Sequence, residues 1–172
     1  MGRLRTRLDG TYLLNLIFTP GLGTDFPGKS YDCAGKFGPS CAPITPKWRH
    51  RMTLDWDTPL QGLSAGLTWR YFGAGKNTTL DPSTPDYNSA TATGMPLADA
   101  RIPTMTYLDL RMSYTYNKIT ARVGVNNVLD KDPPFIDTAN SGGNSIYAES
   151  NTYPSVYDTL GRYLFVNVTM DF

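Results

Sequence analysis

Long runs in which apolar and polar side chains alternate at every position constrain the fold of this chain more than any other feature. In the last run, Leu164, Val166 and Val168 fall on one side of an extended chain, and Asn167 and Thr169 fall on the other. A period of two predicts β-strands that each have one apolar and one polar face. Six segments show this pattern: Thr6–Phe18, Lys47–Thr58, Leu63–Gly73, Thr104–Tyr116, Ile119–Val128 and Leu160–Phe172.

The predicted strands are long. Strands in globular proteins usually have about five or six residues, whereas these segments have roughly 10–13. A strand of that length, rising about 3.3 Å per residue and tilted by about 40°, crosses roughly 25–30 Å, which is the height of the apolar band of an outer-membrane barrel. The first segment is the least regular, because Leu13 and Ile17 interrupt its polar face.

The connections between these strands alternate between long and short. On the boundaries given above they have about 28, 4, 30, 2 and 31 residues, so all the long ones emerge at the same end. The short ones, Pro59–Gly62 and Asn117–Lys118, contain typical turn residues. Transmembrane barrels have this asymmetry, with short turns on one side and long loops on the other.

A soluble β-sandwich is the alternative, since its strands also alternate. A sandwich would place its aromatic side chains in the middle of the strands, and it gives no reason for three loops of about 30 residues. Aromatic residues on the apolar face lie instead toward the strand ends, as in the interfacial girdles of membrane barrels. They are Trp48, Trp56, Trp69, Tyr71, Tyr114, Tyr116 and Phe172. The pattern therefore favours a membrane barrel.

Charge and motif content exclude several functions. The chain has 16 Lys and Arg against 15 Asp and Glu, so it lacks the basic excess of a nucleic-acid-binding protein. The only histidine is His50, and there is no Ser–His–acid order and no phosphate-binding glycine loop. We therefore expect no enzyme activity, no cofactor and no metal site.

The two cysteines, Cys33 and Cys41, lie eight positions apart in a segment rich in Gly and Pro. A disulfide between them would close a short loop and contribute roughly 2–3 kcal/mol in the chain-entropy description. Such a bond implies an oxidising compartment, whereas two free thiols would imply a reducing one. We favour the disulfide.

Six stretches follow one another in a recognisable order: "LDGTYLL" (8–14), "YDCAGKFGPSC" (31–41), "PKWRHRMTLDW" (46–56), "YLDLRMSY" (107–114), "RVGVNNVLDKDPP" (122–134) and "YDTLGRYLFVNVTMDF" (157–172). Together they resemble the C-terminal end of a TonB-dependent outer-membrane receptor. The resemblance implies an all-β fold, an antiparallel up-and-down meander of six long strands that is a segment of a 22-stranded transmembrane β-barrel.

On this resemblance, residues 1–172 are the last six strands of the barrel, and the plug domain and signal peptide are absent. The localisation implied is the bacterial outer membrane. The function implied is uptake of a scarce solute, such as an iron chelate, a cobalamin-like cofactor or an oligosaccharide. The partners implied are the remaining barrel strands and plug, a TonB-type energising protein that contacts the missing N-terminal part, outer-membrane lipid and the assembly machinery. The alternative is a soluble β-sandwich domain that binds glycans.

Three groups of residues are candidates for function. Phe172 and Met170 match the apolar positions of the terminal strand that the assembly machinery reads in this family. The polar face carries charges that either form a ladder with aspartates across strands or face the plug or a solute: Arg49, Arg51, Arg70, Asp109, Arg111 and Arg122. Aromatic residues in the long loops either pack the loops together or contact ligand: Tyr31, Phe37, Tyr87, Phe135, Tyr147, Tyr153 and Tyr157.

Overall fold

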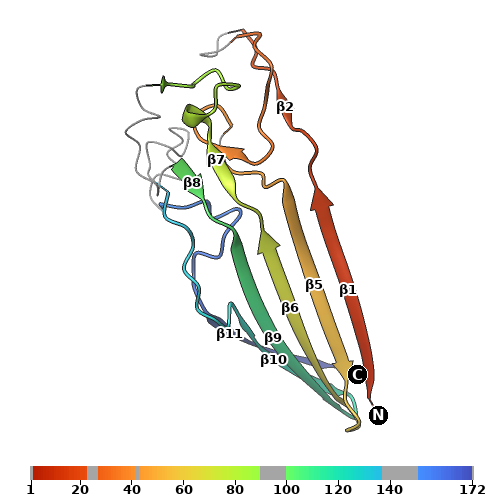
Figure 1. Cartoon of the computed structure of the whole chain (residues 1–172). Coiled ribbons are helices and arrows are strands. Elements are labelled where there is room, and N and C mark those ends of the chain that lie inside the picture. The colour runs from red at the N-terminus through yellow and green to blue at the C-terminus, as the bar shows by residue number, and fades with distance from the viewer. Residues whose placement is uncertain (1, 23–26, 42, 90–99, 137–150, 172) are drawn as a thin grey trace.

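Six long strands form one antiparallel sheet in the computed structural model, which describes residues 2–22, 27–41, 43–89, 100–136 and 151–171. Each strand lies beside its neighbour in the sequence, so the sheet is an up-and-down meander (Figure 1). In order across the sheet the strands are β1 (Arg3–Tyr12), β5 (Trp48–Asp57), β6 (Leu63–Phe72), β9 (Met105–Tyr116), β10 (Ile119–Asn126) and β11 (Tyr163–Met170). The predicted fold class is therefore confirmed.

The strand register gathers the alternating side chains into two continuous faces. Leu8 lies opposite Met52, which lies opposite Trp69 on the next strand, and these residues belong to the apolar face. One position along, Thr53 lies opposite Thr68, which lies opposite Asp109, and these belong to the polar face. Because each strand keeps this register with its neighbours, the predicted apolar positions of one strand lie opposite those of the next.

No residue of the apolar face is buried, and many are exposed. Leu110, Val123 and Val168 are 40%, 42% and 62% exposed. A sandwich would bury these three side chains under a second sheet. Within the part of the chain that the structure describes, no second sheet covers them, and no helix is long and apolar enough to cross a membrane.

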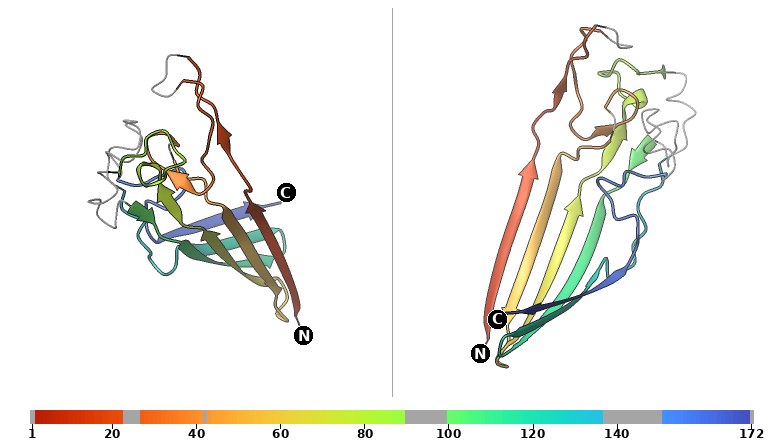
Figure 2. Two further views of the ribbon diagram at one scale, coloured as in Figure 1. Left: turned by 45° about the horizontal axis from the view of Figure 1, so that its top comes forward. Right: turned by 180° about the vertical axis from the view of Figure 1, so that it is seen from behind.

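The two ends of the sheet differ, as the lengths of the connections predict. The end formed by residues 58–62 and 117–118, with the start of β1 and the end of β11, is called the turn end (Figure 1). Gly62 and Asn117 have φ values of 80° and 52°, in the left-handed region that Gly and Asn tolerate best. The three long connections are called loop 1 (residues 13–47), loop 2 (73–104) and loop 3 (127–162), and their described parts lie at the opposite end, called the loop end (Figure 2).

The loops contain short elements and the buried core. These elements are β2 (Ile17–Phe18), β3 (Tyr31–Asp32), β4 (Lys36–Phe37), β7 (Gly75–Asn77), the single-turn helix η1 (Thr78–Leu80) and β8 (Arg101–Ile102). β2 pairs with β3, and β4 from loop 1 pairs with β7 from loop 2, which pairs with β8. The core residues are Phe37, Ile44, Ile102, Met105, Tyr107, Ile136, Tyr153 and Tyr157. The core therefore lies at the loop end and not between two sheets.

The strand boundaries differ from the predicted ones at both ends of the chain. The first strand was predicted over Thr6–Phe18 but runs from Arg3 to Tyr12. One more bond, from the N–H of Leu13 to the carbonyl of Lys47, follows the strand before the chain enters loop 1. The irregular alternation after Tyr12 is the sequence signal of this departure. The last strand is Tyr163–Met170 rather than Leu160–Phe172, and Phe172 lies outside the described residues.

An aromatic side chain on the polar face has a steric explanation. Phe165 lies directly opposite Gly124 on β10, and its ring covers the glycine. A Cβ atom at position 124 would lie 2.4 Å from the ring and 2.8 Å from the carbonyl oxygen of Leu110. Cross-strand pairing of an aromatic residue with a glycine covers backbone that would otherwise be bare.

Candidate functional site

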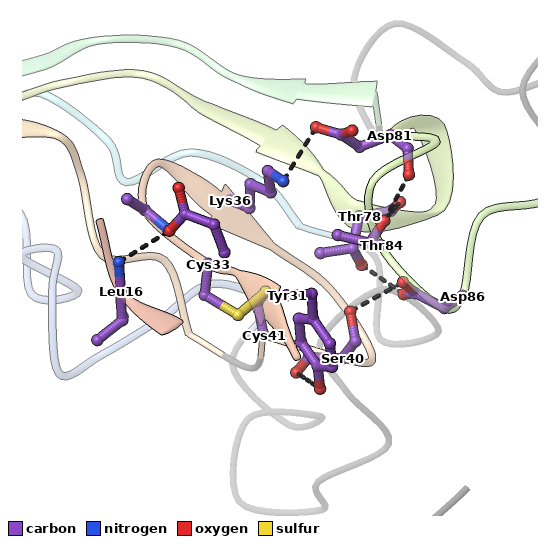
Figure 3. Close-up of a disulfide and its surroundings, with 12 residues drawn as sticks. Leu16, Tyr31, Cys33, Lys36, Ser40, Cys41, Thr78, Asp81, Thr84 and Asp86 are labelled. Carbon is purple, nitrogen blue, oxygen red and sulfur yellow. Dashed lines mark hydrogen bonds and ion pairs between the residues drawn. A yellow bond between two sulfur atoms is a disulfide. The ribbon is translucent and has the colours of Figure 1, made fainter. Parts of the chain in front are cut away.

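Loop 1 is closed on itself by the disulfide between Cys33 and Cys41, as predicted. The sulfur atoms are 2.03 Å apart and the Cα atoms 5.4 Å apart. We call residues 33–41 the disulfide ring. The Tyr31 hydroxyl donates to the carbonyl of Ser40 across the ring, at 2.9 Å (Figure 3). The ring includes β4, so the bond fixes the segment of loop 1 that pairs with loop 2.

Side chains from the disulfide ring bind loop 2. Lys36 Nζ lies 3.2 Å from Asp81 Oδ2 and donates to the hydroxyl of Ser83 at 2.8 Å. Ser40 Oγ donates to Asp86 Oδ1 at 2.8 Å (Figure 3). With the parallel pairing of β4 and β7, these bonds join two loops that are far apart in the sequence.

Asp81 is held in its ionised form by these contacts. Burial alone would raise its pKa, but hydrogen bonds from the backbone and the hydroxyl of Ser83 and from Lys36 outweigh burial. The pKa of Asp81 is therefore lowered to about 2. The contact between loop 1 and loop 2 depends on a carboxylate that stays charged at neutral pH.

Aromatic packing joins loop 3 to the other two loops. Phe37, in the disulfide ring, meets the ring of Tyr153 edge to face at 6.5 Å. Phe72, at the end of β6, meets Tyr107 at 6.2 Å and Tyr157 at 6.0 Å, also edge to face. Burial and the nearby Tyr107 and Tyr153 raise the pKa of Tyr157, so its phenol is neutral. The three loops therefore share one core.

The loop aromatics predicted as ligand contacts fall into two groups. Tyr31, Phe37, Tyr153 and Tyr157 are buried in the loops. Tyr87 and Phe135 are 41% and 63% exposed, so their rings are accessible from outside. The remaining one, Tyr147, lies outside the described residues.

Arg70 is the centre of the ion-pair network on the polar face. Its guanidinium donates to both carboxylate oxygens of Asp109, at 2.8 and 2.9 Å, and to Asp158 of loop 3, at 2.9 and 2.5 Å. The guanidinium carbon also lies 4.9 Å from the centre of the Tyr107 ring. Asp109 accepts a further bond from the backbone N–H of Asn127 at 2.9 Å. One arginine thus ties β6, β9 and loop 3 together.

The other predicted charges of the polar face differ in their partners. Arg111 forms an ion pair with Asp55 across the sheet, whereas Arg49, Arg51 and Arg122 have no carboxylate within 4.0 Å among the described residues. Sequence reasoning missed Asp158, because its position in a loop carries no alternation signal. It also missed Arg5, which pairs with Asp57 at 3.2 Å. The alternation along β1 could have identified Arg5 as a residue of the polar face.

An aromatic cluster lies on the apolar face near the loop end. The indole N–H of Trp48 donates to His50 Nδ1 at 2.9 Å. The His50 ring stacks on Tyr71, with centroids 5.0 Å apart, and meets Trp69 edge to face at 4.7 Å. Amphipathic rings at the end of an exposed apolar face are typical of a membrane interface.

Comparison with known proteins places these features in a family. The model of the family "TonB dependent receptor-like, beta-barrel" matches residues 6–128. Among solved structures, the siderophore receptor PirA from Acinetobacter baumannii is similar, with a TM-score of 0.53 and 16% sequence identity. The similarity covers 98% of this chain and 20% of that one, so the chain spans about a fifth of its length. No curated protein matches the chain.

Proposed function

The chain belongs to the TonB-dependent receptor-like β-barrel family, and from this premise we propose that it forms the last six strands of the barrel of an outer-membrane receptor. In this role residues 1–172 supply part of the barrel wall, three loops that face the outside and the closing strand. The family is one of transport receptors, and we propose no enzyme activity. The localisation that follows is the bacterial outer membrane.

The exposed apolar face is the observation that carries this proposal. It extends without interruption across six strands, it is about as tall as the apolar part of an outer membrane, and it ends in aromatic side chains. In water such a surface would be a site of aggregation, because it greatly exceeds the apolar patches of soluble proteins. Contact with lipid makes the same surface favourable.

The two edges of the sheet support the presence of further strands. Within the described part of the chain, β1 and β11 each have one neighbour in the sheet, so one edge of each strand lacks a strand to bind its N–H and C=O groups. Each unpaired group costs several kcal/mol in lipid. We propose that the remaining strands of a 22-stranded barrel satisfy these groups, and that a plug domain fills the lumen. In that receptor a TonB-type protein would act through a segment outside this chain, and the assembly machinery would read Met170 and Phe172.

For the solute, we favour an iron chelate over a cobalamin-like cofactor or an oligosaccharide. The similar solved structure is described as a siderophore receptor, and the loops of this chain hold exposed rings suited to stacking on a flat ligand. Tyr87 and Phe135 are the loop residues we propose for ligand contact. The polar face would line the passage.

Uptake by a complete receptor that ends in this chain tests the proposal. Cells that lack their own receptors would receive radiolabelled iron chelate, labelled cobalamin or labelled maltodextrin. We expect energy-dependent uptake of the iron chelate. When Tyr87 and Phe135 are both replaced by serine, the chelate concentration that gives half-maximal uptake should rise several-fold. Leu60→Ser, at an exposed position in the turn between β5 and β6, is the control. No uptake of any of the three would contradict the proposed function.

The behaviour of the chain alone separates the receptor from the glycan-binding alternative. A receptor segment requires detergent or lipid, because its apolar face is uncovered. A soluble glycan-binding domain would elute as a compact monomer in buffer without detergent. Size-exclusion chromatography with and without detergent distinguishes the two.

A further inference from the structure

Arginine and lysine are separated in this molecule. None of the six lysines lies in a strand of the large sheet, whereas eight of the ten arginines do. The strand register puts all eight on the polar face, together with only four aspartates. The arginines are Arg3, Arg5, Arg7, Arg49, Arg51, Arg70, Arg111 and Arg122, and the aspartates are Asp9, Asp55, Asp57 and Asp109. The polar face is therefore strongly basic, although the chain as a whole has a net charge of only +1.

The four aspartates are all engaged by four of these arginines. The pairs are Arg5–Asp57, Arg7–Asp9, Arg70–Asp109 and Arg111–Asp55. Among the residues that the structure describes, Arg3, Arg49, Arg51 and Arg122 have no carboxylate within 4.0 Å, and all four are exposed. We call them the unpaired arginines. Asp158 of loop 3 adds a fifth carboxylate to this face through Arg70, so the eight arginines leave a surplus of three positive charges among the described residues.

The unpaired arginines are spread over the height of the sheet. Arg3 lies opposite Asp57 at the turn end, and Arg49 lies eight positions along β5 from Asp57, near the loop end. At about 3.4 Å per residue these two side chains are roughly 27 Å apart. Arg122, on β10, lies three strands away from Arg49. A small solute spans only a fraction of this surface, whereas a folded domain can contact all of it.

We propose that the polar face binds an acidic polypeptide surface, namely a carboxylate-rich side of the domain that fills the barrel. The proposal rests on the proposed function, because it takes the polar face to line the lumen. Exposed arginines are often merely solvated, but solvation gives no reason to exclude lysine from the face. The planar guanidinium binds carboxylates with two parallel hydrogen bonds, which the ammonium group of lysine cannot do. Arg70 binds both carboxylate oxygens of Asp109 in this way within the face itself.

Binding of an acidic peptide tests the proposal. The chain is held in a non-ionic detergent, and a fluorescein-labelled peptide of ten glutamates is the probe, followed by anisotropy at increasing NaCl. Glutamine at the four unpaired arginines should raise the Kd by tenfold or more, about 1.4 kcal/mol, and the affinity of the unchanged protein should fall with salt.

A control with the same change in charge is available outside the polar face. Lys29, Arg101, Lys118 and Lys131 form no ion pair among the described residues, and replacing them by glutamine should change the Kd less than twofold. Equal loss in both variants would overturn the proposal, since net charge alone would then explain binding. The proposal is also overturned if citrate or phosphate displaces the peptide at a concentration equal to the Kd of the peptide. A small anionic solute would then be the better occupant of the polar face.

Two further measurements keep the result interpretable. If the fourfold glutamine variant loses its strand signal in circular dichroism, Arg49→Gln and Arg122→Gln are tested singly. Each should raise the Kd two- to threefold, whereas Arg101→Gln should leave it unchanged. Association of the chain with phospholipid vesicles reports separately on the proposed function. If the chain associates with vesicles but the fourfold glutamine variant binds the peptide as tightly as the unchanged protein, this inference alone is overturned. Failure to associate with vesicles overturns the proposed function.

Discussion

Replacing Cys33 and Cys41 by serine opens the disulfide ring, and we expect the effect to extend beyond loop 1. The ring carries the side chains that hold the loops together: Lys36 and Ser40 bind loop 2, and Phe37 packs on loop 3. Without the covalent closure, these three side chains lose their fixed relative positions. The contacts to loops 2 and 3 should therefore open together with the ring.

The expected magnitude follows from the length of the ring. The cysteines are eight positions apart, so the closed loop has about nine residues. The chain-entropy relation gives about 2.6 kcal/mol at 25 °C for a loop of that length. If the whole loop assembly opens as one unit, its opening equilibrium should rise by roughly 80-fold. The six-stranded sheet should be unaffected, because its hydrogen bonds do not involve the disulfide ring.

Amide hydrogen exchange of the protein in detergent, read by mass spectrometry, measures this effect. Peptides that cover β7 in loop 2 and Tyr153 in loop 3 should exchange roughly 80-fold faster in the double serine variant, and peptides from β5 and β6 should not change. A double substitution of Thr19 and Ser30 to alanine is the control, because it removes a bond outside the ring between residues next to β2 and β3. Faster exchange confined to residues 33–41 would refute the coupling of the three loops.

Three further perturbations give distinct outcomes. Replacing Arg70 by methionine leaves Asp158 without its partner, and breaking a partly buried ion pair by removing one side costs a few kcal/mol. Trypsin should therefore cut loop 3 at least tenfold faster in this variant. The Asp81 carboxyl should titrate near pH 2 by NMR, and because its folded pKa lies below the ordinary value, its stabilising contribution should be present above about pH 4 and be lost as the pH falls toward 2. Lys36→Met should move that midpoint upward. Gly124→Ala should destabilise the sheet by about 1–3 kcal/mol in urea unfolding, because its methyl group would collide with the ring that covers it.

Each of these outcomes has a control or a contrary result. Arg49→Met removes an arginine of the same face that has no carboxylate partner among the described residues, and proteolysis of loop 3 should not change. An Asp81 midpoint that does not respond to Lys36→Met would show that the lysine does not hold the carboxylate. If the Gly124→Ala variant is as stable as the unchanged protein, the ring of Phe165 moves aside freely and the steric explanation is wrong.

The sequence determined the sheet of this protein. Alternation with a period of two is a local property of extended chain, so it places Leu110 and Val123 on one face and Arg111 and Arg122 on the other before any contact is known. The alternation of long and short connections fixed which strand ends lie together. The spacing of Cys33 and Cys41 identified the disulfide, since two cysteines so near in the chain can meet without any help from the rest of the fold.

Only the tertiary structure decided how the loops and charges are used. Whether an arginine is paired depends on which carboxylate reaches it, and Arg70 is paired by Asp158, which is 88 positions away in a loop without periodicity. In the same way, Tyr153 and Tyr157 are buried whereas Phe135 is exposed, although the three residues belong to the same loop. The strand pattern depends only on the order of neighbouring residues in the sequence. Ion pairing and burial depend on distances between segments that come together only after the chain has folded.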